Sequence, residues 1–165
     1  LSMKRGKKAQ IELSFSMIFS ILLIIAFVAV AFYAISYFLH LRNCTQEGMF
    51  VSDLQESVNS VWTASSKNAD FSAPLPSNIK YVCFADFSRQ ANNLQEVYDE
   101  LKIYKGEEAR IYFYPTRKAC NRYYKLQHVN ITEITIQKNP YCVENTGKAS
   151  FNLSKDKFEA LVKIK

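Results

Sequence analysis

The chain has 165 residues, of which 48% are hydrophobic, and its four glycines leave little room for a phosphate-cradling loop. The low glycine count excludes the classes of nucleotide-binding protein that depend on a glycine-rich phosphate loop. The formal net charge is +6 at pH 7, but four of the cations precede residue 9 and one acid, Glu12, follows them, so the rest of the chain carries only +3. The larger part is mildly basic, and its length suits one small domain.

An apolar stretch dominates the N-terminal part of the chain. Residues 13–39 contain no charged side chain. With about 1.5 Å of rise per residue, such a helix exceeds the roughly 30 Å hydrocarbon core of a bilayer. A cleaved secretory signal has an apolar stretch of only about 7–15 residues. We therefore expect a basic leader over residues 1–9, then a transmembrane helix over residues 10–41.

The positive-inside rule predicts how this helix is oriented. The basic cluster at residues 4–8 precedes the apolar stretch, and mixed charge follows it, which places the N-terminus in the cytoplasm. Residues 42–165 then form an extracellular domain. We expect a single-pass protein of the cell membrane.

The helical pattern continues beyond the apolar stretch, because apolar residues recur at three- and four-residue spacing. The apolar stripe consists of Phe50, Val51, Leu54, Val58, Val61 and Trp62. Polar residues such as Asp53 and Asn59 occupy the other side. We expect a nearly continuous helix from about residue 11 to residue 66, whose extension over residues 42–67 packs on a sheet.

The elements that follow are short. Residues 79–87 are apolar on both faces, which is typical of a central strand. Residues 93–104 have the spacing of a short amphipathic helix. We predict further strands at residues 110–114 and 129–137, the latter with a bulge near Glu133.

The end of the chain favours a hairpin of strands over residues 149–153 and 158–164, and a terminal helix from Asp156 is the alternative. Together the elements predict an α+β fold: a long N-terminal transmembrane and amphipathic helix packed on a small, mostly antiparallel β-sheet.

All four cysteines follow the apolar stretch, at Cys44, Cys83, Cys120 and Cys142. No two have the spacing of a zinc site or a C-x-x-C motif, so we expect no metal. In an oxidising exterior, two disulfides are the leading interpretation. Three pairings are open, and the alternative is one disulfide with two buried thiols.

Three N-x-S/T sequons, at Asn43, Asn130 and Asn152, lie on the expected outer side of the membrane. Because all three lie on the side where glycans are transferred, we expect an exposed surface that carries glycans.

The residues Lys7-Lys8-Ala9-Gln10-Ile11-Glu12-Leu13 resemble the class III leader of archaeal type IV pilins, in which a basic stretch ends in Gly or Ala before a Gln-Ile mature start. The resemblance implies cleavage between Ala9 and Gln10. It also implies that Glu12 pairs with a neighbouring subunit's N-terminal amine when helices bundle. The family usually has glutamate at the fifth mature position, which is Ser14 here. Alternatively, Glu12 lies at the headgroup level, solvated or paired with Lys8.

The resemblance and the expected architecture together predict a pilin-like, membrane-anchored extracellular structural protein of a cell-surface filament. It would be a filament subunit or a minor assembly or adhesion component, associating through its N-terminal helix with its own copies or other pilin-like subunits. The alternative is an uncleaved, single-pass accessory or ligand-binding subunit with an extracellular domain.

Catalysis needs convergent acid, base or nucleophilic groups, and no such motif is recognisable, so we expect neither an enzyme nor a cofactor. One group of basic residues is interleaved with tyrosines: Arg110, Arg117, Lys118, Arg122 and Lys125. This combination can hold single-stranded nucleic acid or an anionic glycan. We interpret it first as a strand and a solvated loop with half-buried tyrosines.

Overall fold

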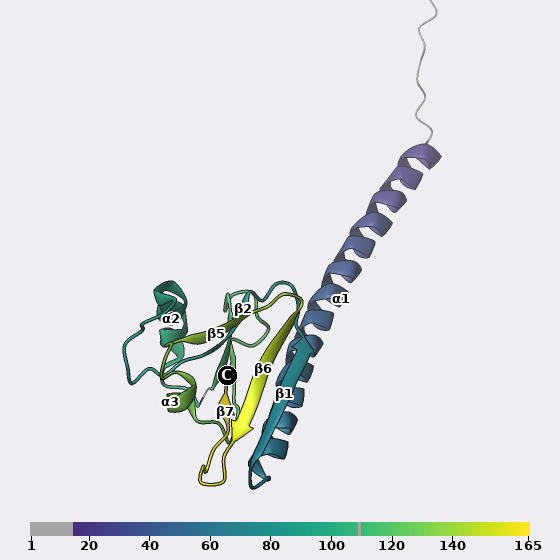
Figure 1. Ribbon diagram of the computed structural model, residues 1–165. Coiled ribbons are helices and arrows are strands. Elements are labelled where there is room, and N and C mark those ends of the chain that lie inside the picture. Colours follow the sequence, from purple (N-terminus) through teal and green to yellow (C-terminus); the bar gives the residue numbers. More distant parts are fainter. Residues whose placement is uncertain (1–14, 109) are drawn as a thin grey trace, which may run out of the picture. The chain divides into compact units, whose positions relative to one another are not determined.

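The computed structural model describes residues 15–108 and 110–165 (Figure 1). They divide into two compact units, one ending at His40 and the other running from Leu41 to Lys165. Helix α1, Phe15–Trp62, contributes to both. The sequence prediction of one nearly continuous helix is confirmed over these residues, and the four residues predicted to precede Phe15 lie outside the described part. The helix ends before the predicted residue 66, because residues 63–66 turn the chain into the strand that begins at Lys67.

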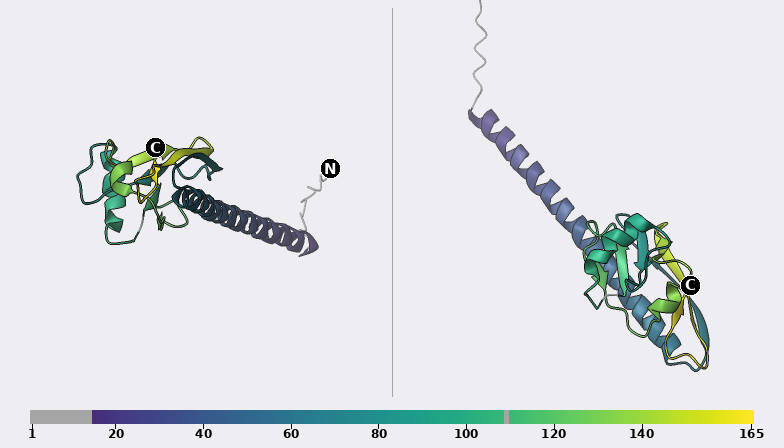
Figure 2. Two further views of the ribbon diagram at one scale, coloured as in Figure 1. Left: turned by 60° about the horizontal axis from the view of Figure 1, so that its bottom comes forward. Right: turned by 90° about the vertical axis from the view of Figure 1, so that its left-hand side faces the viewer.

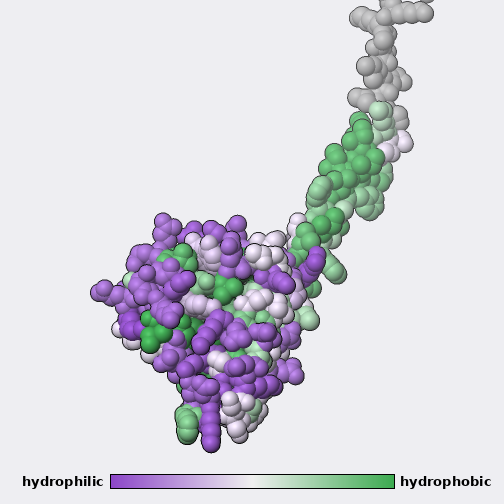
Figure 3. Space-filling view, viewed as in Figure 1, coloured by the Kyte–Doolittle hydropathy of each residue, from purple (hydrophilic) through white to green (hydrophobic). Residues whose placement is uncertain are grey.

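The first unit consists of the apolar part of α1. Every residue from Phe15 to His40 is exposed, and most are large and hydrophobic, as the green surface of this segment in Figure 3 shows. By length and composition this helix is able to cross a membrane. A run of exposed Phe, Ile and Leu of this length is unfavourable in water.

In the second unit, the later turns of α1 bury one face. Phe50, Leu54, Val58 and Val61 are at most 1% exposed. The ring of Phe50 meets Phe71, Phe113 and Phe151 at centroid distances of 5.4, 6.0 and 6.3 Å. The predicted apolar stripe therefore joins the main hydrophobic core of this unit.

Trp62 is an exception to that stripe, because its side chain is 37% exposed. It ends the helix, stacks on His128 with 3.7 Å between ring centroids, and donates its indole N–H to the carbonyl oxygen of Ala160 at 3.1 Å. The expectation that Trp62 is a core residue is wrong. Its position at the helix end leaves one side of the ring in solvent.

A three-stranded sheet lies along the later turns of α1 (Figures 1 and 2). Its order is β1-β6-β7, with β1 at Lys67–Pro74, β6 at Lys148–Lys155 and β7 at Lys163–Ile164. Strand β1 pairs antiparallel with β6 along its whole length. The sequence did not predict β1, and the predicted return strand of the terminal hairpin shrinks to the two residues of β7.

A second antiparallel sheet has the order β4-β3-β2-β5. Its strands are Tyr123–Tyr124, Ile111–Tyr114, Tyr81–Phe84 and Tyr141–Glu144. The predicted central strand is confirmed, because β2 has neighbours on both sides and Val82, Cys83 and Phe84 are fully buried. The described residues therefore form an α+β fold with antiparallel sheets.

Helix α2, Gln95–Leu101, continues as the short 3-10 helix η1, Lys102–Tyr104, which confirms the predicted helix. Val97 and Leu101 of α2 pack with Tyr112 and Cys83 in a second, smaller core.

The predicted strand at residues 129–137 is wrong. Its centre is the helical turn α3, Ile131–Ile134. The side chain of Asn130 caps this turn by accepting the backbone N–H of Glu133 at 3.2 Å. The hydroxyl of Thr135 adds a hydrogen bond to the carbonyl oxygen of Ile131 at 2.7 Å. Local hydrogen bonds thus outweigh the β propensity of the branched side chains.

All four cysteines are paired, as expected. Cys44 of α1 is bonded to Cys120 in the β3–β4 connection, and Cys83 of β2 is bonded to Cys142 of β5. In the second pair the two residues are direct register partners on adjacent strands.

Candidate functional site

The residues predicted for leader cleavage and helix bundling, Ala9, Gln10 and Glu12, lie outside the described residues. The described segment closest to them is the exposed apolar part of α1, which begins at Phe15. The first candidate site is therefore this apolar surface, whose chemistry suits lipid or other apolar helices.

The three sequons lie in different settings. Asn43 is half-buried within α1, and Asn130 caps α3 through its side-chain oxygen. Asn152 is exposed on β6, where its amide nitrogen donates to Asp70 at 2.8 Å. Of the three side chains, Asn152 alone is exposed in the described residues, so it is the most accessible to a glycan transferase.

The five basic residues singled out in the sequence belong to β3, β4 and the segment between them. Arg110 precedes β3 and Lys125 follows β4, so the antiparallel pairing brings these two together. Arg117, Lys118 and Arg122 are exposed in the connecting segment of residues 115–122, here called the basic loop.

Acidic residues reduce the charge of this surface at the Arg110 end. Lys125 forms an ion pair with Glu108. The hydrogen bond from Lys125 and its positive charge lower the pKa of Glu108 below its usual value. A hydrogen bond to Glu107, together with burial, raises the pKa of Tyr123. The exposed cations of the basic loop therefore fit the expected solvated loop, whereas Lys125 is paired with an acid.

The basic loop is fastened to the rest of the unit at three points. Thr116 is buried, and both its backbone N–H and its hydroxyl donate to Oε1 of Glu100, at 2.7 and 2.6 Å. The carbonyl oxygen of Lys118 accepts the side-chain amide of Asn78 at 2.5 Å. Cys120 is held by its disulfide and donates its N–H to Glu47 at 2.9 Å. The cations are thus carried on an ordered loop.

A second connection, residues 85–94 between β2 and α2, is ordered around the buried side chain of Asn139. Its amide oxygen accepts the N–H of Asp86 at 3.0 Å, and its amide nitrogen donates to the carbonyl oxygens of Asp86 and Gln90 at 2.8 and 3.2 Å. Asn92 donates its backbone N–H to the carbonyl oxygen of Asn139 at 2.9 Å. We call this connection the Asn139-bound loop.

Ion pairing also orders this loop. Arg89 contacts Asp86 at 3.0 Å and donates to the hydroxyl of Thr135 at 2.6 Å. Burial alone would raise the pKa of Asp86, but hydrogen bonds from Ser88 and the pairing with Arg89 lower it. The carboxylate is therefore charged at neutral pH and stays bound to its partners.

Two positioning residues were missed in the sequence, Glu47 and Asn139. Glu47 is fully buried, and it precedes Phe50, Val51 and Leu54 by three, four and seven residues, so helical spacing could have placed it on the inward stripe. No sequence pattern marks Asn139, because its partners come from a loop that lies about 50 residues earlier.

Cys44 and Cys120 are joined in a disulfide, which leaves neither sulfur as a thiolate metal ligand.

Comparisons with protein families, with curated proteins and with solved structures found no match for this chain.

Proposed function

We propose that the chain is a pilin-like protein, anchored in the membrane by the apolar part of α1 and presenting an extracellular α+β domain, as a filament subunit or a minor assembly or adhesion component. The single observation that carries this is the continuity of α1. One helix of 48 residues is exposed and apolar up to His40 and supplies core residues to the second unit from Phe50 onward.

The apolar part of α1 needs an apolar environment, which a bilayer or a bundle of identical helices provides. Before assembly, lipid would cover these side chains. In a filament, the helices of neighbouring subunits would cover one another, and Ala and Ser side chains between the larger residues allow close approach. The disulfides of the second unit fit an oxidising exterior.

The resemblance of residues 7–13 to a class III leader supports processing before assembly. Removal of residues 1–9 would give Gln10 a free amine. Glu12 would then be the third residue of the processed chain and would supply a carboxylate. Such a pair between neighbouring subunits would neutralise both charges inside an apolar bundle.

The decisive experiment is N-terminal sequencing of the native protein extracted from membranes. We expect a start at Gln10 and expect Ala9→Leu to block processing, while Ala9→Gly, which keeps the small residue of the leader pattern, serves as the matched control and is processed. Electron microscopy of sheared surface filaments should then show loss of polymer with Ala9→Leu alone.

A native protein that retains residues 1–9 would contradict the filament function. It would leave the anchored accessory subunit as the better interpretation, since an anchored monomer does not need to be processed. Protease added to intact cells should digest the region after Arg42, and recovery of an intact C-terminal domain from the cytosol would contradict both functions.

A further inference from the structure

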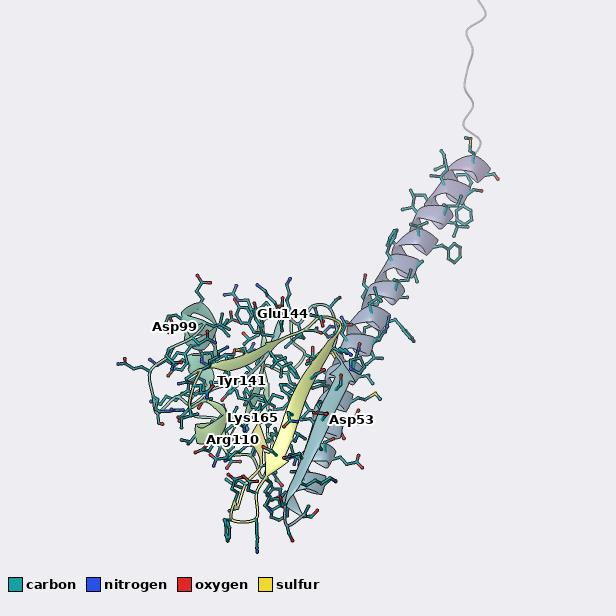
Figure 4. The ribbon with its side chains drawn as sticks, viewed as in Figure 1. Asp53, Asp99, Arg110, Tyr141, Glu144 and Lys165 are labelled. Carbon is teal, nitrogen blue, oxygen red and sulfur yellow. A yellow bond between two sulfur atoms is a disulfide. The ribbon has the colours of Figure 1, made fainter. Side chains whose placement is uncertain are left out.

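Two pockets meet at Phe87 in the Asn139-bound loop. One, of about 380 Å³, lies between this loop and α2 and includes Tyr98, Asp99 and Lys102. The other, of about 300 Å³, extends to the start of β3 and includes Glu107 and Arg110. Asp99 and Arg110 are both labelled in Figure 4.

The residues common to both pockets are Phe87, Ser88 and Lys105. The two pockets therefore share part of their wall, and we call them together the Phe87 groove. Each part is of the size at which proteins bind small molecules.

The cations of the groove are open to a ligand. The side chains of Lys102, Lys105 and Arg110 form no hydrogen bond or ion pair within 4 Å with any residue in the described part of the chain. All three are exposed. No carboxylate of the described residues lies within ion-pair distance of these three cations, although the charge of Arg110 acts on nearby Glu108. The three cations therefore attract acidic groups toward the groove.

The carboxylates of the groove are already engaged but keep free acceptor capacity. Asp99 accepts the side-chain amide of Gln95 at 2.9 Å, Asp86 is paired with Arg89, and Glu107 lies near enough to Tyr123 to raise the pKa of its phenol. An ionised carboxylate has about four lone-pair positions, so each can accept further hydrogen bonds from hydroxyl groups.

The wall of the groove is ordered before any ligand arrives. The ring of Phe87 packs against Tyr98 and Tyr112 at centroid distances of 5.4 and 5.7 Å. The hydroxyl of Tyr98 donates to the carbonyl oxygen of Arg89 at 2.6 Å, and Asn139 holds the loop backbone from inside. Little conformational entropy is then lost on binding.

The geometry points to an acidic oligosaccharide as the ligand of the Phe87 groove. Lys105 and Arg110 would meet the acid groups of the sugars, Asp99 and Glu107 would accept hydrogen bonds from hydroxyls, and Phe87 would cover an apolar ring face. A single-stranded nucleic acid fits less well, because its bases need successive exposed aromatic surfaces, whereas Tyr98 and Tyr112 beside Phe87 are buried. This inference does not depend on polymerisation.

The test uses the full chain in detergent micelles and a fluorescent alginate hexasaccharide, which carries one carboxylate per sugar. We expect Lys105→Ala to weaken binding about tenfold, since it removes a charge-assisted contact shared by both pockets. Lys105→Arg, which keeps the charge, should restore most of the affinity. Phe87→Ala should also weaken binding, and so should Arg110→Ala, an exposed change that tests the groove if Phe87→Ala fails to fold.

Lys118→Ala is the matched control, because Lys118 is an exposed cation on the basic loop, outside the groove. Its affinity should equal that of the unmodified chain. The inference is overturned by no binding at millimolar hexasaccharide, by an equal loss in Lys118→Ala, by equal binding of neutral maltohexaose, or by tighter binding of oligothymidylate.

Discussion

The carboxylate of Glu47 accepts the backbone N–H of Cys120 at 2.9 Å and so joins α1 to a loop 73 residues later in the chain. The side chain of Glu47 is fully buried among the core residues of the second unit. A buried hydrogen bond of this kind matters most when one partner is removed, because the other is then left unsatisfied.

Glu47→Ala should therefore lower the free energy of unfolding by about 1–3 kcal/mol. Glu47→Gln keeps an acceptor oxygen for the N–H of Cys120 and should cost less. Thermal unfolding of the detergent-solubilised chain, followed by near-ultraviolet circular dichroism, measures both. Glu56→Ala, an exposed change on the same helix, is the control, and an effect there as large as that of Glu47→Ala would contradict the prediction.

The inward face of α1 should be far more sensitive to truncation than the outward face. Leu54→Ala is expected to cost about 2–5 kcal/mol through lost burial and a residual cavity, whereas the exposed change Asp53→Ala should stay within about 0.5 kcal/mol. Trp62→Ala should fall between them, because the ring is partly exposed and loses one stacking contact and one hydrogen bond. Equal shifts in melting temperature for Leu54→Ala and Asp53→Ala would mean that the helix does not pack as described.

Removing Asn139 should loosen the loop that it binds. In Asn139→Ala, several backbone groups of residues 86–90 lose their hydrogen-bond partner, so the variant should lose about 3 kcal/mol of stability. Hydrogen–deuterium exchange should rise in this loop first. Asn68→Ala, an exposed change on β1, should leave the exchange pattern unaltered. Unchanged protection of residues 86–92 in Asn139→Ala would show that the loop is ordered by other contacts.

Peptide mapping without reduction should recover two disulfide-linked pairs, Cys44 with Cys120 and Cys83 with Cys142. They join residues 76 and 59 apart, and loop-closure entropy predicts about 4 kcal/mol of stabilisation for each. The double variants Cys44→Ala/Cys120→Ala and Cys83→Ala/Cys142→Ala should thus have similarly lowered melting temperatures. Alkylation of four thiols in the unreduced native protein would contradict the pairing.

Alkaline pH should reveal the burial of Tyr112. Burial raises the pKa of its phenol to about 12, against an ordinary value of about 10 in the unfolded chain. The neutral phenol is favoured in the folded state, so its contribution is complete below pH of about 10 and is lost as the pH rises toward about 12.

Tyr112→Phe removes this ionisation. Between pH 9 and pH 11.5 the variant should lose about 2 kcal/mol less stability than the unmodified chain. Urea unfolding at both pH values measures the difference. Asn68→Ala, an exposed change on β1 that removes no titrating group, should follow the unmodified chain, and parallel pH dependence of Tyr112→Phe would contradict the prediction.

The elements that the sequence predicted well are those whose residues face one constant environment. The later turns of α1 present an apolar face at regular spacing, and the buried β2 is apolar on both sides, so local pattern and tertiary position agree. Strand β1, with Lys67, Asn68, Asp70 and Pro74 among its eight residues, has a composition typical of turns. Its extended structure depends on pairing with β6, which no local pattern reveals.

The failure at α3 has a different cause. The β-branched residues around Ile131 favoured a strand, yet Asn130 and Glu133 have the spacing of a helix N-terminal capping motif. The capping pattern was therefore present in the sequence, but the β propensity of the neighbouring residues outweighed it in the prediction. The Phe87 groove could not be predicted, since its residues come from a loop, a helix and a strand edge that only folding brings together.

The two disulfides are interleaved along the chain, because Cys83 lies inside the loop closed by Cys44 and Cys120, and Cys142 lies outside it. A single proteolytic cut anywhere between Cys44 and Cys142 is consequently bridged by at least one covalent bond. The severed C-terminal part would remain attached to α1, and a nicked molecule would migrate as one piece on a gel until a reducing agent is added. A nicked molecule would in this way keep its C-terminal part where a domain without these bridges would lose it.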